Sequence, residues 1–121
     1  MRSLNKQSKK LSVYLNISPL SVNKCWKGQR FKTKDYKDYE KELLLRLPVK
    51  TLPAPPYQIL FEFGLSNICS DWDNPIKPLQ DILQKKYGFN DKDIMQACVK
   101  KVKVDKGREY FIATLESLDN D

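Results

Sequence analysis

The stretch YQILFEFGL, Tyr57–Leu65, decides how this chain folds, because it shows the most regular alternation of side chains in the sequence. Every second position carries an aromatic or branched apolar residue, and a period of two is typical of a strand with one buried face. We therefore expect this strand to lie in the interior of a sheet.

The segments around this strand predict two helices and three further strands. Apolar residues recur every three or four positions in two regions, which indicates amphipathic helices over residues 34–47 and 74–87. In the second helix, Asn74 is the expected N-cap, Pro75 the first helical residue and Gly88 the stop.

Strands are predicted over residues 11–17, 94–104 and 110–117, with the last two joined as a hairpin through a turn at Gly107. This order of elements predicts an α+β fold, in which two helices pack on a four-stranded mixed β-sheet. We expect a single small domain over residues 1–121, because 121 residues with 40% hydrophobic content suffice for one core. Residues 1–10 are expected to form a flexible basic arm.

The composition excludes several classes of protein and of chemistry. No apolar run approaches the roughly 18 residues of a membrane helix, and the N-terminus has no apolar signal region. The three cysteines are widely spaced and odd in number, which favours a reducing cytoplasm over a disulfide framework. Histidine is absent, so any catalysis must use carboxylates, lysine, tyrosine or a metal held by oxygen.

Positive charge is concentrated in the first part of the chain. Residues 1–50 carry 13 Lys and Arg against 4 Asp and Glu, whereas the net charge of the whole chain is +7. The segment SPLSVNKCWKGQRFKTK, residues 18–34, reads as a basic loop that also carries Trp26 and Phe31. Lysine and arginine suit phosphates and an aromatic ring suits a base, so this pattern favours nucleic-acid binding. The alternative is a flexible loop whose Trp26 packs on the core.

A pair of acids stands where the central strand meets the second helix. Asp71 and Asp73 lie in the stretch SDWDNPIK, and Lys77 lies one turn into the helix. Two carboxylates on one side of a chain suit Mg²⁺, with Mn²⁺ as the other option, because both ions prefer oxygen ligands. The alternative is a helix start with surface acids and no metal.

A second pair of acids, Asp91 and Asp93, follows the second helix. A helix from Asn74 to Tyr87 is about 20 Å long, so these acids start from its far end. Asp91 can therefore join the first pair only if the returning strand or a second subunit brings it there.

The motif D-x-D-N-x-x-K at residues 71–77 resembles the RusA family of Holliday junction resolvases. The similarity continues through Asp81 on the helix, the acidic turn at Asn90 and Asp91, and the K-G-R turn before the last strand. At the front of the chain it includes Pro19, Ser21 and Asn23, so that it spans nearly the whole sequence.

The resemblance implies a magnesium-dependent endodeoxyribonuclease that resolves Holliday junctions by paired symmetric nicks in DNA recombination and repair. Enzymes of this kind are homodimers, usually of phage or prophage origin, and need no small-molecule cofactor. The family pattern assigns the metal to Asp71, Asp73 and Asp91, and an assisting role to Lys77. Asp93 is the alternative third ligand, because the family usually has two adjacent acids here.

Taken with the basic segment, the resemblance gives a set of expected DNA contacts: Asn23, Lys24, Lys27, Arg30, Lys32 and Asn74. Two other classes of function stay open. One is a non-catalytic DNA- or RNA-binding domain whose acids only start a helix. The other is an interaction protein that binds an acidic partner through its basic face.

Overall fold

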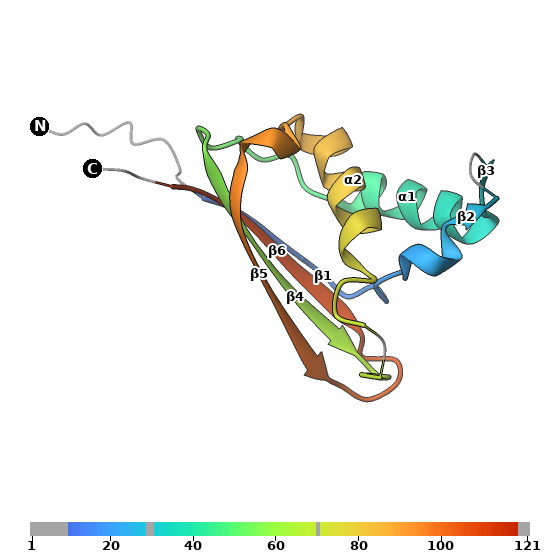
Figure 1. Cartoon of the computed structure of the whole chain (residues 1–121). Coiled ribbons are helices and arrows are strands. Elements are labelled where there is room, and N and C mark those ends of the chain that lie inside the picture. The colour runs from blue at the N-terminus through green and yellow to red at the C-terminus, as the bar shows by residue number, and fades with distance from the viewer. Residues whose placement is uncertain (1–9, 29–30, 70, 119–121) are drawn as a thin grey trace, which may run out of the picture.

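A mixed sheet of four strands forms the centre of the structure, a computed structural model that describes residues 10–28, 31–69 and 71–118 (Figure 1). The strands are β1 (Lys10–Leu15), β4 (Tyr57–Leu65), β5 (Ile94–Lys103) and β6 (Tyr110–Ser117). They lie in the order β1-β6-β4-β5. Strand β6 runs antiparallel to β1 and β4, whereas β5 runs parallel to β4. The predicted interior position of β4 is confirmed.

Two helices, α1 (Lys34–Arg46) and α2 (Ile76–Tyr87), lie on the same side of the sheet (Figure 1). The alternation in β4 places Ile59, Phe61 and Phe63 in the core, each at most 3% exposed. The helices add Leu43 and Leu79, which are fully buried. Burial of one such side chain stabilises the fold by about 1.5–3 kcal/mol. The predicted α+β fold of two helices on a four-stranded mixed sheet is confirmed.

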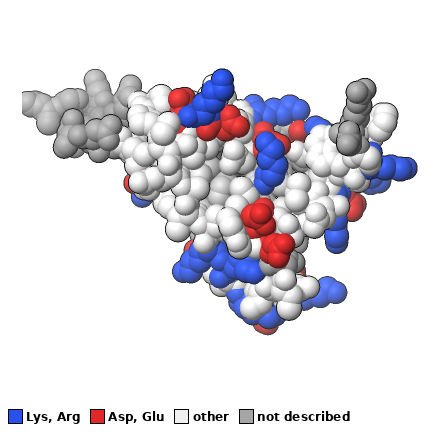
Figure 2. Space-filling model, viewed as in Figure 1, with Lys and Arg blue, Asp and Glu red and all other residues white. Residues whose placement is uncertain are grey.

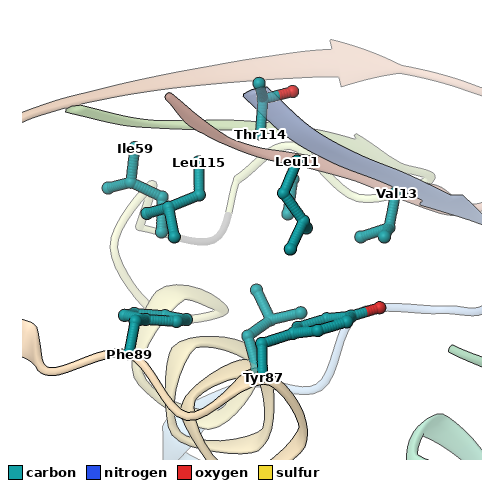
Figure 3. A pocket seen from close by; sticks show the side chains of 9 residues that line it. Leu11, Val13, Ile59, Tyr87, Phe89, Thr114 and Leu115 are labelled. Atoms are coloured by element: carbon teal, nitrogen blue, oxygen red, sulfur yellow. The ribbon is translucent and has the colours of Figure 1, made fainter. Parts of the chain in front are cut away.

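The C-terminal end of α2 closes the core against the sheet (Figure 3). Tyr87 and Phe89 lie opposite Leu11, Ile59 and Leu115. The space between them is about 10 Å³, the lower limit for a single water molecule. This seam is therefore part of the packed core.

Helix α2 begins later than its sequence predicts. Its N-cap is Pro75, which makes no side-chain capping hydrogen bond, so the prediction of Asn74 as N-cap is wrong. The reason lies in the preceding turn, where the Ile76 N–H bonds the Asp73 carbonyl at 3.1 Å. The predicted stop is confirmed, because Gly88 ends the helix in the left-handed conformation at φ 83°.

Strands β5 and β6 do not form the predicted hairpin, because β4 lies between them. Their connection instead crosses the end of β4, where the Val104 N–H bonds the Leu65 carbonyl at 3.0 Å. Gly107 does take the expected positive φ, at 94°. The turn was thus predicted correctly and the strand pairing was not, because a turn sequence is local and the pairing partner is not.

The basic segment before α1 is more ordered than the predicted loop. It forms a short 3₁₀ helix, η1 (Val22–Lys24), and a two-stranded ribbon of β2 (Trp26–Lys27) and β3 (Phe31–Lys32). Thr33 then starts α1, because its side chain accepts a hydrogen bond from the Tyr36 N–H at 3.1 Å.

The predicted basic arm, residues 1–10, lies outside the described residues except for Lys10, which opens β1. Within residues 10–28, 31–69 and 71–118, neither helix has the length and apolar character that crossing a membrane requires.

Candidate metal and nucleic-acid site

The first acid pair lies in the connection between β4 and α2, here named the acid loop (residues 66–75). Asp71 and Asp73 are both exposed. The loop turns through backbone hydrogen bonds, including one from the Asn74 N–H to the Asp71 carbonyl at 3.2 Å. Both carboxylates therefore lie in the connection that follows an interior strand, as the order of segments predicts.

Two lysines of β5 hold the first part of the acid loop against the sheet. The Lys101 Nζ donates to the Ile68 carbonyl at 2.8 Å, and the Lys103 Nζ donates to the Ser66 carbonyl at 2.7 Å. Figure 2 shows acidic side chains next to a group of basic side chains near the end of the sheet where β4 and β5 end.

The acid loop also contacts the basic segment, which lies about fifty residues earlier in the sequence. The Val22 N–H of η1 donates to the Asn74 carbonyl at 2.8 Å. Next to η1, the Ser21 side chain accepts a hydrogen bond from the Asn23 N–H at 3.2 Å. The structure thus brings the Pro-Ser-Asn element and the acid motif, which the resemblance treats as two signatures, into direct contact.

A pocket of about 480 Å³ lies where these segments meet, and it is named the polar pocket here because most of its lining residues are polar. It collects three of the predicted DNA contacts, Asn23, Lys24 and Asn74. Its remaining lining residues are Ser18, Pro19, Leu20, Ser21, Leu65, Ser66, Asn67 and Glu109. Reasoning from the sequence missed Ser66, Asn67 and Glu109, because no local pattern marks them.

Lys77 lies in the first turn of α2, as predicted, but its ammonium group is engaged along the helix. Its Nζ lies 3.0 Å from the Asp81 carboxylate, one turn further on, and its side chain is 62% exposed. An exposed pair of this kind is worth less than about 1 kcal/mol. Lys77 can therefore leave Asp81 for a ligand at little cost.

The second acid pair lies at the other end of α2. Asp91 and Asp93 belong to the 3₁₀ helix η2 (Asp91–Asp93), which follows the C-terminus of α2 and precedes β5. Twelve helical residues, about 18 Å, separate this end from the acid loop. Strand β5 starts beside the acids and runs away from them, parallel to β4 (Figure 1).

The returning strand therefore does not bring Asp91 or Asp93 back to the acid loop, and that route to a complete site is wrong. Among the described residues, no three side chains of the Asp, Glu, Cys or His type come together in a way that could hold a metal. Of the two routes that the sequence left open, only a second subunit remains.

The remaining predicted DNA contacts fall into different settings. Lys27 is exposed on the ribbon, together with Trp26 and Phe31, which are 42% and 72% exposed. Trp26 also packs edge-on against Tyr36, with ring centroids 5.7 Å apart, so the core-packing alternative is correct for one side of the indole. Arg30 lies outside the described residues.

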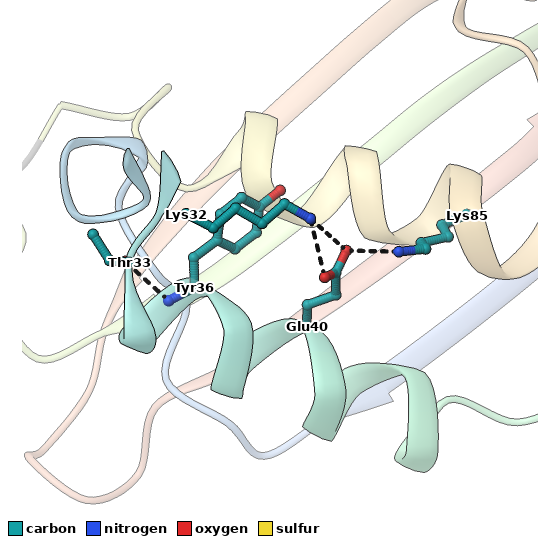
Figure 4. A network of polar contacts seen from close by, with 5 residues as sticks. All are labelled: Lys32, Thr33, Tyr36, Glu40 and Lys85. Atoms are coloured by element: carbon teal, nitrogen blue, oxygen red, sulfur yellow. Dashed lines mark hydrogen bonds and ion pairs between the residues drawn. The ribbon is translucent and has the colours of Figure 1, made fainter. Parts of the chain in front are cut away.

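Lys32 is partly buried and is engaged in contacts within the chain (Figure 4). Its Nζ lies 3.1 Å from the Glu40 carboxylate and 5.1 Å from the centre of the Tyr36 ring. Lys85 also contacts Glu40, at 3.3 Å. Burial alone would raise the pKa of Glu40, but the hydrogen bonds and charges of the two lysines outweigh burial and lower it. We therefore assign Lys32 mainly to the stability of the fold.

Comparison with models of known protein families and with curated proteins finds no match for this chain. The similarity to the RusA family thus depends on the motif residues themselves.

Proposed function

We propose that this chain is a magnesium-dependent endonuclease that cuts branched DNA, with the four-way Holliday junction as its substrate in recombination and repair. The observation that carries this proposal is the hydrogen bond between Val22 and Asn74 at 2.8 Å. It joins the basic segment, which suits a DNA backbone, to the loop with two exposed carboxylates. A phosphate held at the polar pocket would therefore lie against Asn74, the residue that follows Asp73 in the chain.

The donor set of the acid loop fits Mg²⁺. Asp71 and Asp73 offer only oxygen atoms, and Mg²⁺ is commonly held by one or two carboxylates together with waters and a substrate phosphate. Mn²⁺ accepts the same ligands. When bound, such an ion polarises the phosphate and acidifies a water. The contribution of this chain is to hold both carboxylates on a short loop between two packed elements.

Lys77 supplies the positive charge that phosphodiester cleavage requires. Its exposed side chain starts from the first turn of α2, next to the acid loop. Released from Asp81, the ammonium group would stabilise the negative charge that develops on the phosphate oxygens or on the leaving oxygen. In this proposal the ammonium group of Lys77 contacts the DNA substrate. In the absence of DNA, the same group pairs with Asp81.

The DNA backbone is bound by Asn23 and Lys24 at the polar pocket and by Lys27 on the ribbon. Trp26 and Phe31 on the same ribbon offer exposed rings on which unpaired bases at a branch point can stack. Replacing Lys24 or Lys27 with Glu should weaken binding to every DNA sequence about equally. Removal of one lysine–phosphate interaction should also reduce the salt slope of binding by about 0.9.

A homodimer would place two such sites about a two-fold axis, which matches the near two-fold symmetry of a four-way junction. The three cysteines are free thiols, with Cys69 and Cys98 exposed. We therefore place the protein in a reducing compartment, the cytoplasm.

The test compares Asp71→Asn and Asp73→Asn with the wild type on a labelled four-way junction in the presence of Mg²⁺. Loss of an outer-shell partner of a metal already costs about 10–100-fold, so loss of a ligand should reduce cutting by at least about 100-fold. Junction affinity in the absence of metal should be unchanged. Asp35→Asn is the matched control, because Asp35 is also exposed but lies on α1, outside the acid loop. Retained cutting by both site variants would refute the proposal.

A second candidate is a non-catalytic DNA- or RNA-binding domain. It is favoured by one observation, that the described residues of a single chain assemble no group of three metal ligands. Tight junction binding that ignores Mg²⁺, without any cutting by the wild type, would establish this alternative.

A further inference from the structure

An apolar groove of about 520 Å³ lies between the start of α2 and strand β5, at the edge of the sheet. Its volume falls within the range of about 300–1,000 Å³ that is typical of sites for small molecules. Its lining includes Phe61, Trp72, Ile76, Gln80, Ala97 and Val99. Among the residues that the structure describes, none lines both this groove and the polar pocket. The groove is therefore a separate candidate binding site.

Trp72 is the exposed aromatic residue of this groove. It is 57% exposed, and within the described part of the chain no other aromatic ring packs against it. The backbone around it is held by two turns. The Asn74 N–H donates to the Asp71 carbonyl at 3.2 Å, and the next turn closes from the Ile76 N–H to the Asp73 carbonyl at 3.1 Å. A flat partner can therefore stack on the indole ring with little cost of ordering the loop.

Trp72 also separates the two carboxylates of the candidate metal site. Asp71 and Asp73 are its direct neighbours in the chain, and all three residues are exposed. Only the oxygen atoms of the two acids serve as ligands for Mg²⁺, so the residue between them needs no particular side chain to hold the metal. The large ring at this position is therefore available for a different contact.

Two lysines stand beside the groove along the elements that line it. Lys77 directly follows Ile76 on α2, and its side chain is 62% exposed. On β5, Ala97, Val99 and Lys101 are alternate residues, so they share one face of the strand. A nucleotide combines a flat, apolar base with an anionic phosphate. Apolar walls with positive charges beside them are complementary to both parts.

The groove carries few hydrogen-bonding groups, and they lie on two side chains. Gln80 offers an amide with donors and an acceptor, and Trp72 offers its indole N–H. Gln80 lies one helical turn after Ile76, on the same side of α2. In mostly apolar sites, a small number of polar groups fixes the orientation of the ligand. A carboxamide pairs with the donors and acceptors on the edge of a base, so Gln80 is suited to distinguish one base from another.

We propose that this groove binds one unpaired base of the branched DNA, with the base stacked on Trp72 and its edge hydrogen-bonded to Gln80. Extruded bases are commonly held between aromatic and apolar side chains and read along their edges. The base comes from the branch point, because unstacking costs least where a base is not firmly paired. The inference rests on the proposed nuclease. Since Trp72 lies between the two acids in the chain, the bound base should belong to a nucleotide next to the cut phosphate.

Occupation of the groove is tested without metal, so that the readout does not require cutting. Trp26→Phe leaves Trp72 as the only tryptophan of the chain. Acrylamide should quench the fluorescence of Trp72 in the free protein, because the ring is exposed. Saturation with a four-way junction in EDTA should shield Trp72 from acrylamide, whereas plain duplex should not.

Three results would overturn the inference. The first is a Trp72 that stays accessible to acrylamide when the junction is bound, or a protein that does not bind the junction. The second is equal shielding by plain duplex, which has no unpaired base. The third is shielding that depends on the protein concentration in the absence of DNA, because a second copy of the chain would then cover the groove.

The contribution of the ring is measured by junction affinity in the absence of metal. Trp72→Ala should weaken binding by about 5–150-fold, the value of one base stacked on an aromatic ring, and Trp72→Phe should recover most of the loss. Ile68→Ala is the matched control, because Ile68 is an apolar residue of the same loop, is 45% exposed and lies outside the lining of the groove. Equal losses for Trp72→Ala and Ile68→Ala would overturn the stacking.

The reading of the base is tested with junctions that differ only in the base at the branch point. The wild type should prefer one base by about 5-fold or more, and Gln80→Leu should remove this preference. Gln84→Leu is the matched control, because Gln84 lies one turn further along α2 and does not line the groove. A preference that survives in Gln80→Leu would overturn the role of this amide.

The base site and the proposed nuclease fail in different ways. Shielding of Trp72 by the junction in a protein that never cuts DNA would refute the nuclease and leave the base site in place. Cutting of the junction by a protein whose Trp72 stays accessible in the complex would refute the base site and leave the nuclease in place.

Discussion

Glu40 links three elements of the fold, and its replacement by Gln gives a quantitative test of the packing around the basic segment. Its carboxylate on α1 accepts a hydrogen bond from Lys32 of the ribbon at 3.1 Å and one from Lys85 of α2 at 3.3 Å (Figure 4). The side chain of Glu40 is only 16% exposed. Glu40→Gln keeps the size and shape of the side chain and removes its charge.

The two hydrogen bonds differ in their expected contribution to stability. The Lys32 side chain is 33% exposed and its Nζ lies near the Tyr36 ring, so this charge-assisted bond should contribute about 1–1.5 kcal/mol. Lys85 is 57% exposed and should add at most about 0.5 kcal/mol. Glu40→Gln should therefore lower the free energy of unfolding by about 1–2 kcal/mol at pH 7. For a domain of this size that corresponds to a melting temperature lower by about 3–8 °C.

The effect should depend on pH in one direction. The lysines hold the pKa of Glu40 below its ordinary value of 4.5, although burial acts in the opposite sense. A carboxyl whose pKa is lowered by folding stabilises the protein above its unfolded pKa, and this stabilisation is lost as the pH falls through the folded pKa. The difference in stability between the wild type and Glu40→Gln should therefore be largest near pH 7 and become smaller as the pH falls below 4.5.

Urea unfolding followed by circular dichroism at pH 7, 5 and 3 measures this difference. Glu42→Gln is the matched control, because Glu42 is on the same helix but is 51% exposed and pairs along the helix, with Arg46 at 2.8 Å. The free energy of unfolding of Glu42→Gln should stay within about 0.5 kcal/mol of the wild-type value at every pH. A Glu40→Gln loss that is the same at pH 7 and pH 3, or no larger than that of Glu42→Gln, would contradict the reasoning.

Two further predictions concern the core and the sheet. Cys25 is fully buried, and burial raises its pKa to about 11. A thiol reagent at pH 8 should therefore modify Cys69 and Cys98 in the folded protein, and should modify Cys25 only in urea. Mass spectrometry counts the adducts. Three adducts without denaturant would contradict the burial of Cys25. A Cβ at Gly64 would lie 2.2 Å from the Tyr110 ring, so Gly64→Ala should cost about 1–3 kcal/mol in unfolding experiments. Adding Tyr110→Ser should recover part of that cost, and strict additivity of the two changes would exclude the contact.

The elements of this fold were readable from the sequence because their signals are local. The alternation in β4 and the helical spacing in α1 depend on neighbouring residues, and both agree with the structure. The neighbours of β5 depend on contacts far along the chain. The pattern of Ile94–Lys103 therefore predicted a strand but not its place at the edge of the sheet.

In the candidate site, too, the features that depend on local sequence were predictable and those that depend on distant contacts were not. The position of Asp71 and Asp73 at the end of a strand was predictable, because it follows from the order of segments. The contact between Val22 and Asn74 was not, because only the folded sheet brings these residues together. The pairing of Lys77 with Asp81 could have been predicted from their spacing of four residues on a helix.

One measurement tests the central claim most directly: the wild-type protein is incubated with a mobile four-way junction, a Y-fork and plain duplex, each with and without Mg²⁺. We predict that Mg²⁺ allows the protein to cut the four-way junction at symmetric positions and that plain duplex stays intact. Without the metal, no substrate should be cut. An intact junction in the presence of Mg²⁺ and Mn²⁺, at protein concentrations that fully bind it, would contradict the assignment of the acid loop as a nuclease site.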